Sequence, residues 1–298
     1  MPDGLVAIQL CSSPPAGSLG YPVVAHEVGH ILSYKRQLVY ELISEPTLTN
    51  VWDELVKERN VELTAIARQW LEEWLCDAIG AFLMGPAFSF ASLAFSPSLV
   101  KDIRPLVIPH PPWQARHPMI LSTILDENDE LGYKSLEPLE VNQEKVDVAE
   151  ILRSWQALIQ QSASPLPPEK HALYERLKPF HKPIIELARQ QCGPHIYGPE
   201  KFGPEVSALV GRLTNNILPN EVEIWNDLES RWEFKIPTLP GILNAAWVYQ
   251  LSSESQFSLE HVVDKLEGEV TLERDITRFA RMISRAVELA EVKRSWSS

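Results

Sequence analysis

A long run without helix-breaking residues is the strongest constraint on the fold of this chain. From Val51 to Met84 the sequence contains no proline, and its only glycine is Gly80. Apolar residues recur along this run at the spacing of a helix with one buried face. They are Val51, Leu55, Val61, Leu63, Ile66, Trp70, Leu71, Trp74, Leu75, Ile79 and Phe82. We therefore expect one long helix or two in sequence, ending at Gly85-Pro86, because proline cannot continue a helix.

The rest of the chain shows the same preference. Helical patterns run from Val23 to about Arg36, from about Pro112 to Asp126 and from about Leu272 to Val292. A single short strand is expected at Val6–Leu10. The predicted fold class is mainly α, with at most a small β element near the N-terminus and a helical C-terminal half.

A polar stretch, "DENDELGYKSLEPLEVNQEK", interrupts these patterns at residues 126–145. It marks either a domain boundary or a surface connection. We expect one domain over residues 1–135 and a helical region over residues 136–298, which is either separate or packed on the first as one unit. The 298 residues, 45% of them hydrophobic, suffice for either arrangement.

The net charge and the cysteine content limit the partners and the cellular compartment that we expect for this protein. The net charge is -13, and no basic run is present, so we expect neither a nucleic-acid partner nor an anionic membrane. Three widely spaced cysteines, Cys11, Cys76 and Cys192, do not form a disulfide framework and indicate a reducing compartment. The apolar stretch over residues 78–95 is too interrupted for a membrane span. Without a recognisable secretion signal, these features predict a soluble cytoplasmic protein.

The segment "HEVGH" contains the residue types of a zinc site. His26 and His30 are four residues apart on a predicted helix, so they share one face and can bind one zinc ion. Glu27 would lie beside that metal without binding it, as a general base for a water molecule does. Gly29 would let another element pack close to the helix. An exposed polar helix face is the alternative, but the apolar flanks "VVA" and "IL" argue against it.

A catalytic zinc needs a third protein ligand, and the long helix offers one. Glu73 and Asp77 are four residues apart in "EEWLCD". Glu73 can supply a carboxylate ligand, and Asp77 can accept the free N–H of a ligand histidine. Glu72 is an alternative ligand without an acid four residues further on. A solvated acidic face is the remaining alternative, and Cys76 is expected in the core.

The pair "HEVGH … EEWLCD" resembles the gluzincin metallopeptidases, whose pattern is HExxH followed on a later helix by ExxxD. The resemblance covers about the first third of the chain and implies zincin-like metal-binding helices. It implies that His26, His30 and Glu73 are zinc ligands, that Glu27 is the base, and that Asp77 orients a ligand. Gluzincins carry a sheet before the first motif, whereas this chain has a short lobe there. The rest of that lobe is either missing, supplied by the C-terminal helices or a partner chain, or lost with a wrongly placed start of the sequence.

A peptidase also stabilises the oxyanion of its tetrahedral intermediate. The segment "PHPPWQAR" offers His110, which is held before two prolines, with Arg116 in the helix that follows. The alternative role of His110 is to cap that helix, and the two interpretations remain open. His117 is expected to be structural.

Two hypotheses follow from these residues. The first is a zinc-dependent hydrolase, favoured as a metallopeptidase acting on a peptide or protein substrate, with a non-peptide amide bond as a variant. The second is a helical interaction protein with a structural or vestigial zinc site. A structural zinc is usually coordinated by four protein ligands. A fourth side chain on the metal, such as His110, would therefore favour the second hypothesis.

Overall fold

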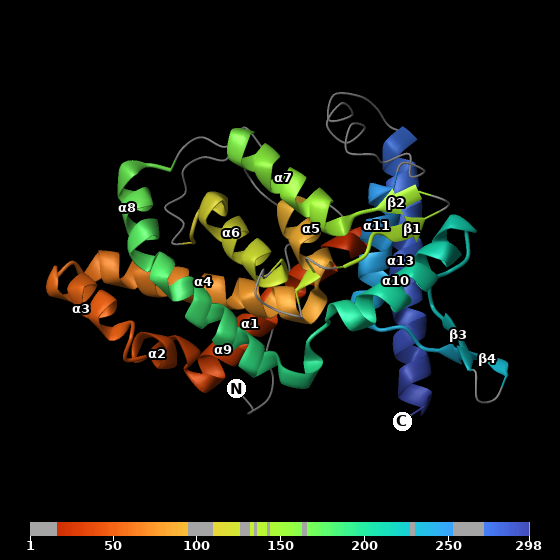
Figure 1. The fold of residues 1–298 in the computed structure, drawn as a ribbon, viewed down its shortest axis with the longest axis horizontal. Coiled ribbons are helices and arrows are strands. Elements are labelled where there is room, and N and C mark those ends of the chain that lie inside the picture. The colour runs from red at the N-terminus through yellow and green to blue at the C-terminus, as the bar shows by residue number, and fades with distance from the viewer. Residues whose placement is uncertain are drawn as a thin grey trace.

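The computed structural model of the protein describes residues 17–94, 110–125, 132–133, 136–141, 144–162, 166–226, 230–252 and 271–297. Helices dominate these residues, which confirms the mainly α fold class (Figure 1). Those of the first half are η1 (Gly17–Val23), α1 (Val24–Arg36), α2 (Leu38–Ile43), α3 (Thr49–Lys57), α4 (Val61–Met84), α5 (Pro86–Ala94) and α6 (Trp113–Ile124). Those of the second half are α7 (Val148–Ser162), α8 (Pro168–Leu177), η4 (Lys178–Phe180), α9 (His181–Cys192), η5 (Gly193–His195), α10 (Pro199–Thr214), α11 (Leu239–Leu251) and α13 (Thr271–Ser297).

The predicted helical run over residues 51–84 is two helices in sequence, α3 and α4. The chain breaks between them at Arg59, whose φ is 54°. The Asn60 side chain then accepts a hydrogen bond from the Leu63 backbone N–H at 3.0 Å, which satisfies one of the free donors at the start of α4. Gly85 ends the helix with a φ of 60°, a conformation that glycine adopts without strain. Local sequence signals therefore set both ends of α4.

Helix α4 is the central element of the fold. From Trp70 to Phe82 all but one of its residues are buried, so helices cover it on several sides. Helices α1, α6 and α9 pack directly on it, and Figure 1 shows it running between them. Because α1 and α4 carry the two sequence motifs, this packing brings the motifs together.

Two apolar clusters form the core. One joins α2 and α4 to α8 and α9, and the other joins α5 to α7, α10, α11 and α13. Asn244 of α11 ties the second cluster to the corner between α4 and α5. Its amide accepts a hydrogen bond from Ala87 N–H at 2.8 Å and donates one to the Met84 carbonyl at 2.7 Å. Both clusters draw on residues from either side of position 135, and the division of the chain there stays a prediction.

The β structure in the described residues consists of two antiparallel hairpins. The first pairs β1 (Leu139–Val141) with β2 (Glu144–Val146), and the second pairs β3 (Val222–Asn226) with β4 (Arg231–Lys235). Both lie within residues 136–298, the region that the sequence predicted to be helical. The predicted strand at Val6–Leu10 lies outside the described residues. None of the helices among the described residues is both long and apolar enough to cross a membrane.

Candidate metal centre

Helices α1 and α4 approach each other backbone to backbone. A Cβ atom placed on Gly29 would lie 2.7 Å from the Cα atom of Cys76, closer than real Cβ contacts. A glycine is therefore needed at this crossing, as the sequence predicted. His26 and His30 flank Gly29 on α1, and Glu73 and Asp77 flank Cys76 on α4, so the crossing brings the side chains of the two motifs together.

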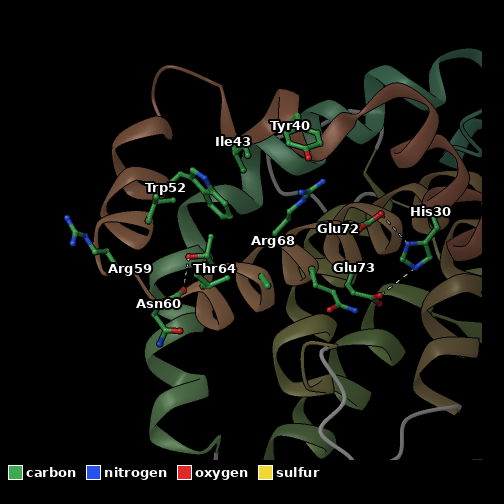
Figure 2. Close-up of a pocket in the computed structure, with 14 residues that line it drawn as sticks. His30, Tyr40, Ile43, Trp52, Arg59, Asn60, Thr64, Arg68, Glu72 and Glu73 are labelled. Carbon is green, nitrogen blue, oxygen red and sulfur yellow. Dashed lines mark hydrogen bonds and ion pairs between the residues drawn. The ribbon is translucent and has the colours of Figure 1, made fainter.

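The three predicted ligands converge. His26 Nε2 lies 3.1 Å from His30 Nε2 and 3.3 Å from Glu73 Oε2, and His30 Nε2 lies 3.5 Å from Glu73 Oε1. Ligand atoms held at the bond lengths of a tetrahedral zinc site lie roughly 3.3 Å apart. Figure 2 shows His30 and Glu73 turned toward each other at one end of a pocket. The His26–His30–Glu73 group can hold a metal ion, with one ligand atom from each residue.

The burial of these atoms supports a metal site. Glu73 is 1% exposed and His26 is 6% exposed. Among the described residues, Glu73 Oε2 is buried without a hydrogen bond, although His26 Nε2 lies 3.3 Å and an Arg116 Nη atom 3.6 Å from it. These longer contacts compensate a buried carboxylate oxygen less well than a bound cation would. Two imidazole nitrogens that face each other can share only one proton. A divalent cation would satisfy the carboxylate oxygen and both nitrogens at once, so the donor set fits one.

Asp77 orients the first histidine. Its Oδ1 lies 2.9 Å from His26 Nδ1, so the ring donates from Nδ1 and keeps Nε2 for the metal side. Arg116 of α6 holds Asp77 in turn, donating from Nε to Oδ2 at 2.8 Å and from one Nη atom to Oδ1 at 2.6 Å. The Arg116 guanidinium also lies 4.6 Å from the centre of the Trp113 ring. The sequence placed Arg116 in the helix after His110, but it did not predict that Arg116 holds Asp77.

The pKa values show how charge is arranged when no metal is bound. Burial alone would raise the pKa of Asp77, which is completely buried, but Arg116 and His26 outweigh it and lower that pKa. Burial also opposes ionisation of Glu73, whose pKa is nonetheless lowered by His110, His26 and Arg116. For His26, burial lowers the pKa, yet the hydrogen bond to Asp77 and the nearby Glu73 carboxylate raise it to about 9. Without a metal, the carboxylates therefore stay charged and His26 carries a proton near neutral pH, so a bound metal ion would displace that proton.

The two candidate glutamates occupy different positions around the histidines. Glu73 belongs to the ligand group, whereas Glu72 Oε1 lies 3.7 Å from the other ring nitrogen of His30, Nδ1. Glu72 can therefore orient His30 much as Asp77 orients His26. The rotation of α4 against α1 sets this difference, which neighbouring residues in a sequence cannot show.

His110 contacts one of the ligands, whereas Glu27 is placed only by its position directly after His26 on α1. Glu27 precedes His30 by three residues on α1 and is half-buried, and within the described part of the chain no hydrogen bond or ion pair involves it. His110 precedes α6, and its Nδ1 lies 2.7 Å from Glu73 Oε1 while its side chain remains 47% exposed. His110 is thus brought to the site, and its role toward a substrate stays a prediction.

A groove opens from the centre along α4. It has a volume of about 680 Å³ and lies between α4 and the pair α2 and α3 (Figure 2). His30, Glu72 and Glu73 line one end, and Arg59 and Asn60 line the other. The candidate metal centre therefore borders an open groove of this size.

His117 is a buried histidine beside the centre. It is 3% exposed, its ring packs against Trp113, and neither ring nitrogen has a hydrogen-bond partner among the residues that the structure describes. Burial lowers its pKa from 6.5 to about 4. Between about pH 6.5 and pH 4, His117 is therefore protonated in the unfolded chain but not in the folded chain. We expect His117 to lower the free energy of unfolding by roughly 3 kcal/mol as the pH falls from about 6.5 to about 4.

Urea unfolding of the metal-free protein at several pH values measures this loss. The His117→Leu variant should show a shallower dependence of stability on pH over that window. The matched control is His171→Leu, which removes an exposed histidine of α8 and should leave the slope as it is. An unchanged slope in His117→Leu would refute the assignment.

Comparison with protein-family models, with curated proteins and with solved structures finds no match for this chain. The functional argument therefore depends on the residues and geometry of the site.

Proposed function

We propose that this protein is a zinc-dependent hydrolase of the gluzincin type and acts as a metallopeptidase on peptides or proteins. One observation carries the proposal. Two histidines and one buried glutamate converge within metal-binding distance, and Glu27 sits in the same helix directly after the first ligand. This is the arrangement in which a carboxylate serves as base beside a metal.

Each side chain has a task in this proposal. His26, His30 and Glu73 hold the zinc, which when bound supplies Lewis acidity toward a carbonyl group and a water molecule. Glu27 takes a proton from the attacking water and passes it to the leaving amine. Asp77, clamped by Arg116, keeps the His26 ring in the tautomer that leaves Nε2 free.

His110 and the groove complete the proposed active site. The half-exposed ring of His110 lies against the ligand Glu73, beside the place where negative charge develops on the carbonyl oxygen. The groove along α4 accepts the substrate chain and leads its scissile bond to the metal. Three protein ligands among the described residues leave a coordination position for water, as catalytic zinc sites require.

Zinc content and hydrolysis test the proposal together. After reconstitution with zinc and desalting, elemental mass spectrometry should find about one zinc per chain, and the loaded protein should cleave members of a random peptide mixture. X-ray absorption should count three protein ligands with a remaining light-atom ligand from water. Absence of zinc would refute the metal centre. Zinc closed by a fourth protein ligand, without cleavage, would favour the structural site of an interaction protein.

A further inference from the structure

The groove has a defined direction because one face of α4 forms its floor. The lining residues of this helix recur at helical spacing and are Val61, Thr64, Ala65, Arg68, Gln69, Glu72 and Glu73. With a rise of about 1.5 Å per residue, the distance along α4 from Glu73 to Val61 is about 18 Å. An extended peptide covers about 3.3 Å per residue, so this length accommodates about five residues beyond the metal.

The wall opposite α4 is largely apolar. Tyr40 and Ile43 of α2 and Trp52 and Val56 of α3 line it, and Figure 2 shows Tyr40, Ile43 and Trp52 along that side. Two aromatic side chains and two aliphatic ones provide contact area for apolar substrate side chains. Charge in the groove is confined to its metal end and to Arg59 and Arg68.

Arg68 differs from the other arginines near the centre. Its guanidinium carbon lies 4.1 Å from the centre of the Tyr40 ring, so an aromatic face positions it. Among the described residues no carboxylate forms an ion pair with it, whereas Asp77 and Glu73 pair with Arg116. The nearest acid along the groove floor, Glu72, is paired with His30 instead. Figure 2 shows the Arg68 side chain reaching from α4 toward the Tyr40 ring.

We propose that Arg68 binds a carboxylate of the substrate about two residues from the scissile bond, while the apolar wall takes the flanking side chains. This inference rests on the proposed peptidase function. The spacing follows from α4, because Arg68 precedes Glu73 by five residues, or about 7.5 Å along the helix. A guanidinium fork suits a carboxylate through two parallel hydrogen bonds. The carboxylate belongs either to an acidic side chain or to the C-terminus of the substrate.

Peptidyl hydroxamates test the inference, because the hydroxamate group binds zinc and fixes the register of the peptide. Three probes are compared: one has Glu at the second residue and an amidated end, one has Gln there, and one is a dipeptide with a free C-terminal carboxylate. Dissociation constants are measured by calorimetry on the zinc-loaded protein. We expect a carboxylate probe to bind at least about tenfold more tightly than the Gln probe. Tight binding of the Glu probe identifies an acidic side chain, and tight binding of the dipeptide identifies a C-terminus.

Matched variants assign the preference to one residue. Arg68→Gln should abolish the preference for the carboxylate and leave the affinity for the Gln probe within about twofold of wild type. Arg59→Gln, the same change at the far end of the groove, should keep the preference. Equal binding of all three probes to zinc-loaded wild type, or a preference that survives in Arg68→Gln, would overturn the carboxylate site alone. A protein that retains no zinc would overturn the proposed function and this inference with it.

Discussion

Replacing Glu27 with Gln is expected to lower kcat for peptide hydrolysis by about 10²- to 10⁴-fold while about one zinc per chain remains. The amide has nearly the same shape as the carboxylate but cannot accept a proton from water at neutral pH. The three ligand side chains do not change, and Glu27 belongs to none of their hydrogen bonds. Initial rates on a cleaved peptide, with zinc content measured on the same sample, give both quantities.

Two further variants make this result specific. Glu27→Asp keeps a carboxylate on a side chain that is shorter by one methylene group. This variant should therefore retain more activity than Glu27→Gln. Glu41→Gln removes an exposed glutamate of α2 that lies outside the groove, and it should leave both rate and zinc content unchanged. Activity retained in Glu27→Gln at full zinc occupancy would sink the proposed mechanism. Loss of zinc in that variant would instead place Glu27 among the ligands.

Local patterns in the sequence predicted much of the site because helices have a fixed period. Residues four apart share one face of a helix, so spacing alone pairs His26 with His30, and Glu73 with Asp77. The structure brings the first three of these side chains together as a group that can hold a metal. It also confirms helices at the predicted places, including α1 over Val24–Arg36.

What the sequence could not supply depends on the packing of distant segments. The choice of Glu73 over Glu72 depends on how α4 is rotated against α1, and that rotation is set where Gly29 meets Cys76. The clamp of Arg116 on Asp77 depends on where α6 crosses α4. The spacing of residues along one helix predicts neither the rotation of α4 nor the position at which α6 crosses it.

The two hairpins escaped prediction for a different reason. Strands are recognised by alternation between a buried face and an exposed one. In β4 the large side chains Trp232 and Phe234 are 58% and 62% exposed, so their alternation does not report a buried face. Strands β1 and β2 have three residues each, and β1 lies inside a stretch whose polarity indicated a connection.

Replacing Glu73 with Ala is expected to weaken zinc binding by more than about 100-fold. Loss of a residue that only orients a ligand typically costs 10- to 100-fold, and Glu73 is proposed to bind the metal itself. Competition with a chromophoric chelator measures the affinity. Glu73→Gln serves as a second variant because it keeps the side-chain volume at this buried position, where Ala leaves a cavity beside Arg116. Circular dichroism of both variants checks that loss of zinc does not reflect loss of fold.

The adjacent glutamate provides the matched control for this prediction. Glu72→Ala removes the same side chain one residue earlier on α4, and its carboxylate faces His30 Nδ1 rather than the ligand atoms. It should therefore weaken zinc binding by no more than an orienting residue does, about 10- to 100-fold, and by less than Glu73→Ala. Asp77→Asn should weaken zinc binding within the same range, because His26 would keep its Nε2 but lose a charged partner at Nδ1.

Unchanged affinity in both Glu73 variants, or a larger loss in Glu72→Ala, would reverse the ligand assignment. If Glu72 were the ligand, α4 would have to turn about its axis, which the contact between Gly29 and Cys76 opposes.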